Sequence, residues 1–208
     1  MPRVLGPIPA DRWERVVRDE LRKQLPADWV VICNVTWVSG EGRYVQEGQA
    51  DFVVLVPNSG MVILEVKGSR EIWIDSDGCW YRSDISGDKI LIPKSPPEQA
   101  MSNMHRLAKI VEEKGGWAKF PGRYSWIVAY PNGKANQVPV MFDSSTLITS
   151  RHMHELASSL RLSLEKRGPE AVATHFSGSK IDKIAEILTS QPLQLARWIQ
   201  MLMLEMMS

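Results

Sequence analysis

Two neighbouring apolar segments constrain this chain most, because each carries ionisable residues where a buried strand normally has none. The first segment is 51–56 (DFVVLV) and the second is 61–67 (MVILEVK). Burying a carboxylate without a partner costs several kcal/mol, and the group then tends to become protonated. A divalent cation held between the acids would offset that cost.

The turn between the two segments predicts how they pair. Residues 57–60 read Pro-Asn-Ser-Gly, and both Asn and Gly tolerate positive φ, so we expect an antiparallel hairpin. Counting outward from the turn brings Asp51 opposite the stretch Glu65–Lys67, to within about one residue of register. Glu65 and Lys67 share a face because side chains alternate along a strand. The pattern therefore places two acids and one ammonium group at one end of a sheet.

This set of groups suits the hydrolysis of phosphodiesters. Magnesium prefers oxygen ligands and often takes only one or two carboxylates, with water for the rest. We therefore expect Asp51 and Glu65 to bind Mg²⁺ or Mn²⁺, with the backbone carbonyl of Val66 as a further ligand. Such a metal polarises the phosphate and lowers the pKa of an attacking water. Lys67 would orient or deprotonate that water and offset the negative charge of the transition state.

Simpler readings of the same residues exist. Asp51 could cap a strand, and Glu65 with Lys67 could form a surface pair on an edge strand. The unbroken apolar runs argue against an exposed edge, because strands that are buried on both faces read this way.

The same residues resemble the core motif of the PD-(D/E)xK nucleases, in which Asp51 is followed after thirteen residues by Glu65-Val-Lys67. The wider strings are similar to the NERD (nuclease-related) domain; they cover residues 48–56, 60–68, 77–80 and 97–100. This resemblance covers roughly residues 10–150. It implies a metal-dependent nuclease that acts on DNA, or on RNA, with Asp51, Glu65 and Lys67 in the site.

The resemblance also assigns two accessory residues. An acid on the first helix matches Glu14, as a further metal ligand, and a glutamine at the start of a later helix matches Gln99, as part of the catalytic group. Read without the family, Glu14 is simply an acid in the first turn of a helix, where acids are favoured. Family members often carry an acid where this chain has Gln49, so no carboxylate ligand is expected there.

Polar residues on the later helix predict a contact with nucleic acid. Gln99, Asn103 and Arg106 fall on one line of the helix that begins near Pro97, beside an apolar stripe. An amide near a helix start and an arginine further along could grip a phosphate. We add Arg70 to this predicted nucleic-acid-binding group, because it follows Lys67 closely.

The implied fold class is α/β, with a restriction-endonuclease-like core (αβββαβ, a mixed sheet flanked by helices). Periodicity predicts most of this order. The expected helices span about 10–25 and from 97 on, and the expected strands about 29–37, 51–56, 61–67, 71–74, 79–82, 124–130 and a pair near 138–149. We expect residues 1–150 to form the nuclease-like domain. Residues 151–208 would form a helical extension, packed on it or linked to it, with helices near 151–167 (capped by Ser150), 169–176, 179–190 and 191–207.

Composition narrows the function further. A net charge of +1 over 208 residues argues against sequence-blind coating of DNA, which needs many phosphate contacts. The longest apolar runs are too short for a membrane span, so no membrane partner is expected. Cys33 and Cys79 are far apart without metal spacing, which is typical of reduced thiols in a cytoplasmic protein.

An alternative from another class stays open. The chain could be a catalytically silent module that binds nucleic acid or docks a protein in a DNA repair or defence assembly. The Met-rich face of 191–207 could pack on the domain, or it could contact a second copy or a helicase-type partner.

Overall fold

The computed structural model describes residues 1–39, 46–84, 86–136, 142–166 and 176–190. Its strands are β1 (Arg3–Leu5), β2 (Val30–Ser39), β3 (Gln46–Val56), β4 (Gly60–Val66), β5 (Glu71–Ile74), β6 (Trp80–Ser83), β7 (Lys89–Leu91), β8 (Arg123–Tyr130), β9 (Lys134–Asn136) and β10 (Leu147–Thr149). Its helices are α1 (Arg12–Gln24), α2 (Pro96–Gly115), the 3₁₀ helix η2 (Ser150–Glu155), α3 (Leu156–Glu165) and α4 (Ser179–Thr189). No helix among the described residues is long and apolar enough to cross a membrane.

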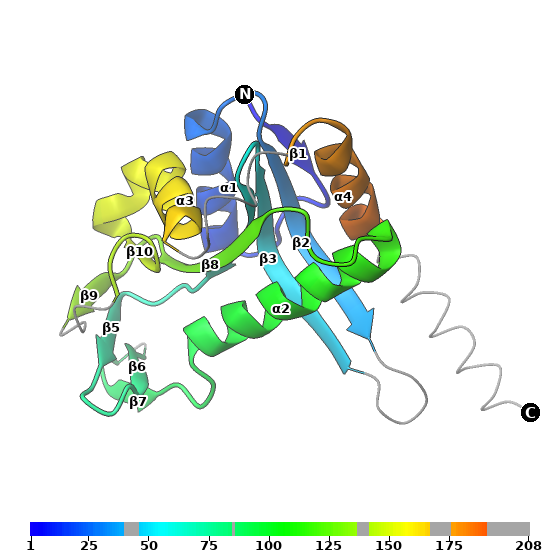
Figure 1. Ribbon diagram of the computed structural model, residues 1–208. Helices are drawn as coiled ribbons and strands as arrows, with labels where there is room; N and C mark the ends of the chain where they lie inside the picture. The colour runs from blue at the N-terminus through cyan, green and yellow to red at the C-terminus, as the bar shows by residue number, and fades with distance from the viewer. Residues whose placement is uncertain (40–45, 85, 137–141, 167–175, 191–208) are drawn as a thin grey trace, which may run out of the picture.

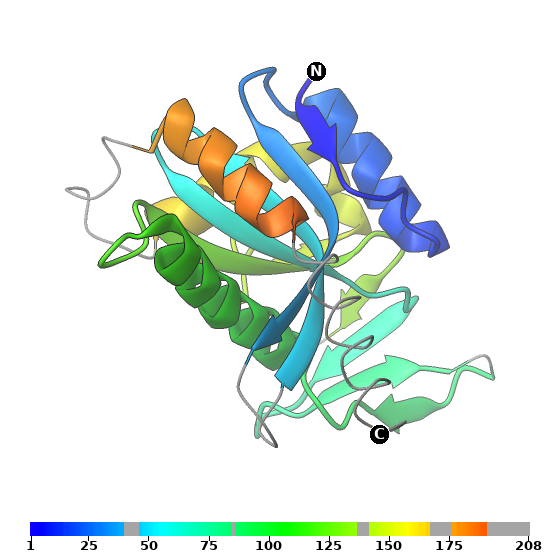
Figure 2. The same cartoon turned by 90° about the vertical axis from the view of Figure 1, so that its right-hand side faces the viewer.

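A six-stranded mixed sheet forms the centre of the fold, in the order β1-β2-β3-β4-β8-β10. Strands β2, β3 and β4 pair antiparallel, whereas β8 joins β4 in parallel. Helices α2 and α4 cover one face of this sheet, and α1 and α3 cover the other (Figures 1 and 2). The order α1-β2-β3-β4-α2-β8 is the αβββαβ order of a restriction-endonuclease-like core, as expected.

Cover on both faces explains why β4 reads as an almost continuous apolar run. Every residue of β4 is buried. Met61 and Ile63 pack in the core under α2 and α4, while Leu64 and Val66 pack in the core under α1 and α3. A sheet that is buried on both sides needs this pattern. An acid within such a strand has no route to bulk water except at the end of the strand.

Local sequence signals fix where the two helices nearest that strand end begin. The carboxylate of Asp11 accepts hydrogen bonds from the backbone N–H groups of Trp13 (2.7 Å) and Glu14 (3.2 Å), so it caps α1. At α2, Ser95 and Glu98 form a capping box, with proline in the first turn. These caps put Glu14 and Gln99 in the first turns of their helices.

The helices that follow residue 150 pack against the central sheet. Leu160 of α3 lies in the core with α1, and Ile184 of α4 lies in the core with α2; both side chains are fully buried. The start of the predicted helix 151–167 was wrong, because η2 precedes α3. The Ser150 hydroxyl donates to the carbonyl of Gly133 (3.0 Å) instead of capping a helix. The predicted segment 191–207, and all but the last residue of the predicted segment 169–176, lie outside the described residues.

A second, four-stranded sheet has the order β7-β6-β5-β9 and lies beside the central one (Figure 1). Its β5–β6 hairpin corresponds to the expected strands 71–74 and 79–82. Strand β7 lies between the expected strand 79–82 and the helix expected from 97, where no strand was predicted, and β1 was not predicted at all. Both are three residues long, which is too short for a strand pattern to show.

Candidate active site

Asp51 and Glu65 lie on adjacent strands at the same end of the sheet. The β3–β4 register pairs Phe52 with Leu64, so Asp51 and Glu65 come directly after that pair. Oδ2 of Asp51 accepts a hydrogen bond of 2.7 Å from the backbone N–H of Val66. The hairpin thus brings the two acids together within the register that the turn predicted.

The backbone of β2 departs from a regular strand opposite Asp51. Ile32 and Val35 are three positions apart yet pack in the same core, so the alternation of faces is interrupted between them. Asn34, which lies in that interval, takes a left-handed backbone with φ 52°. Asn is one of the few residues that tolerate this conformation. The interruption lies at the level of Asp51 on the neighbouring strand.

Lys67 connects the acid of β4 to helix α2. Its Nζ donates to Oε1 of Glu65 (2.6 Å) and to Oε1 of Gln99 (3.1 Å). The Glu65 side chain is 1% exposed, whereas the Lys67 side chain is 31% exposed. An ammonium group has three N–H donors, and these two contacts use two of them. Lys67 therefore extends from a buried carboxylate to the solvent.

Burial raises the pKa of the carboxyl groups in this region, so they ionise less readily. The pKa of Glu65 is raised to about 7, first by burial and then by the charge of Asp51, against the lowering effect of Lys67. Burial also raises the pKa of Asp51, although the Val66 amide and Lys67 oppose this. On α1, the pKa of Glu14 is raised to about 7 by burial, followed by the charges of Asp51 and Asp11. The charge of Asp51 raises the pKa of both Glu65 and Glu14, so the three carboxyls form one electrostatic group.

Two buried polar atoms here have no hydrogen-bond partner within the described residues. They are Oε2 of Glu65 and the hydroxyl of Tyr130. Burial, the largest cause, and the charge of Glu65 both raise the pKa of Tyr130, while Arg82 lowers it. Sequence reasoning missed Tyr130, and the parallel pairing of Val66 with Ala129 explains its position. Its one signal in the sequence is a tyrosine at the end of a strand, just before the turn residues 131–133.

The donor set fits magnesium or manganese better than zinc. Within the described ranges, no group of three or more His, Cys, Asp or Glu side chains is placed to hold a metal. Asp51 and Glu65 offer two carboxylates, and Oε2 of Glu65 is a buried oxygen without a partner. Magnesium often binds through one or two carboxylates and keeps its waters, whereas zinc sites use three or four protein ligands. The Val66 amide, not its carbonyl, makes the observed contact with Asp51.

The two residues of α2 that were predicted to contact phosphate, Asn103 and Arg106, have partners within the protein. Asn103 is buried: its Oδ1 accepts from the indole of Trp37 (3.1 Å), and its Nδ2 donates to the carbonyl of Gln49 (2.7 Å). Its amide therefore joins α2 to the sheet and is not available to a ligand. Arg106 donates to Oε1 of Gln46 (2.6 Å) and lies over the ring of Trp37. This places it along α2 beside β3, away from Gln99 and the acids.

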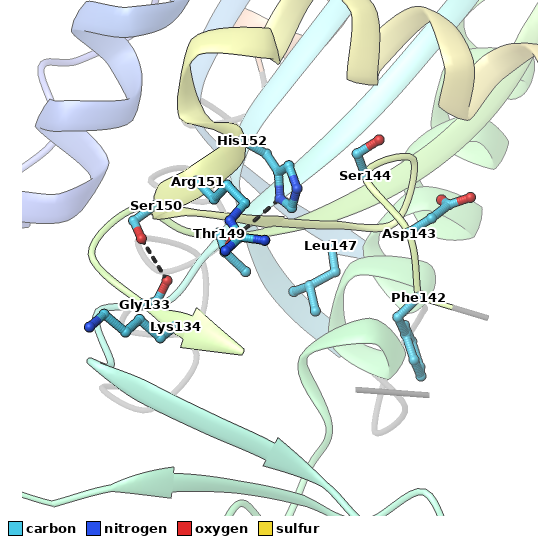
Figure 3. Close-up of a pocket in the computed structure, with 10 residues that line it drawn as sticks. All are labelled: Gly133, Lys134, Phe142, Asp143, Ser144, Leu147, Thr149, Ser150, Arg151 and His152. Atoms are coloured by element: carbon cyan, nitrogen blue, oxygen red, sulfur yellow. Dashed lines mark hydrogen bonds between the residues drawn. The ribbon is translucent and has the colours of Figure 1, made fainter. Parts of the chain in front are cut away.

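The other predicted contact, Arg70, is exposed. It lines a hollow with Arg12, Trp13 and Lys134. A larger cavity of about 810 Å³ lies around β10 and η2, where Figure 3 shows Lys134, Arg151 and His152 among its lining residues. No acid of the β3–β4 hairpin lines either space.

Comparison with known proteins gives one family. The family described as NERD, nuclease-related domain, matches residues 10–130. No curated protein matches the chain. Among solved structures, the crystal structure of protein VC1899 from Vibrio cholerae is similar, with a TM-score of 0.35 and 14% identity. The similarity covers 73% of this chain and 33% of that one, so this chain spans about a third of its length. The NERD match covers more than half of the chain and includes the hairpin with Asp51, Glu65 and Lys67. The protein therefore belongs to the NERD, nuclease-related domain, family.

Proposed function

We propose that this protein is a metal-dependent nuclease that hydrolyses phosphodiester bonds, with DNA as the preferred substrate. The observation that carries the proposal is the group at the end of the β3–β4 hairpin. Asp51 and Glu65 are neighbours there, one oxygen of Glu65 has no partner among the described residues, and Lys67 reaches from Glu65 to the surface. A buried acid that only stabilised the fold would have both oxygens satisfied.

Each residue has a distinct task in this proposal. Asp51 and Glu65 would bind Mg²⁺ or Mn²⁺, with Glu14 close enough on α1 to influence the charge of the site. When bound, the metal would polarise the scissile phosphate and lower the pKa of an attacking water. Lys67 would use its remaining N–H to orient that water or to neutralise charge on the phosphate. Gln99 fixes the position of the ammonium group through its 3.1 Å contact.

A digestion assay tests the proposal. Purified protein is incubated with circular duplex, linear duplex and single-stranded DNA, and with RNA, in Mg²⁺, Mn²⁺ or a chelator. We expect cleavage of at least one DNA form with metal and none with the chelator. Asp51→Asn and Lys67→Ala should each lose this cleavage while keeping the melting temperature of a folded protein.

Matched variants outside the site control for charge. Asp75→Asn removes a partly exposed carboxylate from the turn of the β5–β6 hairpin, and Lys119→Ala removes an exposed lysine beyond the far end of α2. Both should cleave like the wild type. Wild-type protein that cleaves none of these substrates with either metal would refute the enzyme proposal, as would cleavage that survives Asp51→Asn.

A silent binding module is the second candidate. It is favoured by the contact of Lys67 with Glu65, because an ion pair partly satisfies the acid without a metal. It is also favoured because the described residues lack a group of three metal-binding side chains. Binding of DNA that is equal with and without metal, together with no cleavage, would support the module.

A further inference from the structure

Exposed cations from three separate elements meet beside the candidate site. Arg12 comes from the first turn of α1, Arg70 from the loop after β4, and Lys134 from β9, and together they line one hollow of about 340 Å³. Trp13 and the residues Glu71 and Asn132 complete its lining. The gathering of positive charge is notable because the whole chain carries a net charge of only +1.

The backbone fixes this hollow next to the proposed catalytic lysine. The N–H of Lys134 donates to the carbonyl of Arg70 (2.7 Å), so the start of β9 is joined to the loop that follows β4. Gly68, the residue after Lys67, lies against the indole of Trp13, where an added Cβ would be 2.4 Å from Cδ1. The side chains of the hollow are therefore carried by segments that also carry Lys67 and Glu14.

The cations of the hollow are not neutralised by the described part of the chain. Arg70 and Lys134 have no acidic partner there, although Glu71 lines the same hollow, and the guanidinium of Arg12 lies 4.6 Å from the centre of the Trp13 ring. Some cations elsewhere are paired, as Arg3 is with Asp182 at 2.7 Å. Oδ1 of Asn132 is also buried without a partner among the described residues.

The same cations extend into two neighbouring hollows. Arg70 also lines a space of about 460 Å³ with Arg82, where Asp84 is the acidic neighbour. Lys134 also lines the cavity of about 810 Å³ that Arg151 borders, where Asp143 is the acidic neighbour. We call the series Arg82, Arg70, Arg12, Lys134 and Arg151 the basic band. Shared lining residues make it a continuous track and not three isolated pockets.

We propose that the basic band binds the sugar–phosphate backbone of DNA and leads it to Asp51, Glu65 and Lys67. The inference rests on the proposed function, because it assigns the surface that holds the substrate of that site. A small anion would need one enclosed pocket, whereas spaced cations along an open track fit the regularly spaced phosphates of a strand. Such contacts set the position of the strand and carry no sequence information, so the band predicts cleavage without strong sequence preference.

The test measures DNA binding without metal, so that binding is separated from cleavage. Fluorescence anisotropy follows a labelled single strand and a labelled duplex of about 20 nucleotides in chelator, over a series of salt concentrations. The variant is Arg70→Gln combined with Lys134→Gln. The matched control is Lys109→Gln combined with Lys119→Gln, two exposed lysines on or just beyond the far half of α2. Melting temperatures confirm that all variants fold.

We expect the band variant to bind at least one of the two DNA forms about tenfold or more weakly, and the slope of log affinity against log salt to fall by about 1 for each cation removed. The control should stay within about twofold of the wild type. Equal binding by the band variant and the wild type would overturn the inference, as would an equal loss in the control.

The failures of the two proposals are distinguishable. If the wild type cleaves DNA but the band variant binds and cleaves like it, the basic band is wrong and the nuclease proposal stands. If nothing is cleaved but the band variant still loses metal-free binding, the nuclease proposal fails and the band stands. Asp51→Asn should bind DNA in chelator at least as well as the wild type, because it leaves every cation of the band in place.

Discussion

Two hairpins of this protein carry acids in opposite electrostatic states. On the β5–β6 hairpin, the partly exposed carboxylate of Asp75 accepts hydrogen bonds from the N–H of Cys79 (2.8 Å), the N–H of Asp77 (3.1 Å) and the hydroxyl of Tyr81 (3.0 Å). These bonds, led by that of Cys79, lower its pKa. On the β3–β4 hairpin, burial raises the pKa of Asp51 and that of Glu65.

The difference separates an acid whose ionised form stabilises the fold from acids whose ionised forms destabilise it. Ionised Asp75 is stabilised where it is, because the turn supplies its donors. Ionised Glu65 lies in an almost dry place beside another acid, and one of its oxygens has no donor among the described residues. Proteins keep such unfavourable groups where function needs them, at a cost in stability. The contrast supports the proposal that the β3–β4 end is the functional region, without reference to any relative.

The largest expected effect is a loss of cleavage when an acid of the β3–β4 hairpin is replaced, with no such loss for the acid of the β5–β6 hairpin. Glu65→Gln keeps the shape of the side chain but removes the charge that would bind metal. We expect cleavage to fall by about 100-fold or more. Asp75→Asn should change cleavage by less than about twofold. Rates of plasmid digestion at saturating Mg²⁺ measure both, and similar losses in the two variants would break the comparison.

Metal should stabilise the protein through one hairpin only. At pH 8, Mn²⁺ at about 100 times its dissociation constant should raise the melting temperature of the wild type by about 5–10 °C. The same addition should raise that of Glu65→Gln much less, because the ligand is gone. Differential scanning fluorimetry with a chelator as reference measures this. An equal shift in Glu65→Gln would place the metal elsewhere.

The pH dependence of stability should reveal the buried acids. The pKa of Glu65 is about 7 in the folded protein but 4.5 as its ordinary value, so the folded state binds more protons between these limits. Stability from this group is therefore complete below about pH 4.5 and is lost as the pH rises through 7. We expect the metal-free protein to melt several degrees lower at pH 8 than at pH 5. Glu65→Gln should flatten this fall, and an unchanged profile would contradict the assignment.

The smallest expected effect is a change in melting temperature when Asp75, which accepts hydrogen bonds within its own turn, is replaced. Asp75→Ala removes the acceptor for three donors, so it should lower the melting temperature slightly. The carboxylate is partly exposed, so water replaces part of what is lost and the decrease should not exceed a few degrees. Thermal unfolding at pH 7 measures it. A rise in melting temperature would show that this acid, too, opposes folding.

The site was predictable from sequence where its residues are close along the chain. Asp51, Glu65 and Lys67 lie on one hairpin, so turn chemistry and strand alternation were enough to bring them together. Gln99 was reached only through the family, because no local rule says which strand a helix start will face. The contact of Asn103 with Trp37 was not foreseen because Trp37 is 66 positions away, and a polar helix position looks the same whether it faces solvent or a distant indole. Tyr130 was missed because it ends β8, which pairs in parallel with β4 only after a long connection that includes α2. No single turn joins the two strands, so no turn predicts their pairing.

Helices and strands were likewise predictable where their signals are local in the sequence. The long strands and α1, α2 and α4 were expected from their periodicity and caps. Helix α3 starts late because the Ser150 hydroxyl contacts Gly133, seventeen positions earlier in the chain. Strands β1 and β7 exist only through their neighbours, since three residues carry no pattern of their own.

One absent methyl group sets how closely the first helix approaches the end of β4. The indole of Trp13 fills the space that a side chain at Gly68 would need. A larger residue at position 68 would require the Trp13 indole or α1 itself to shift, and Glu14, next to Trp13 on that helix, would move with α1. If the proposed site binds a cation, its affinity would then be adjustable from a position that touches no ligand, which would give natural variation a means of tuning the proposed activity without altering the acids.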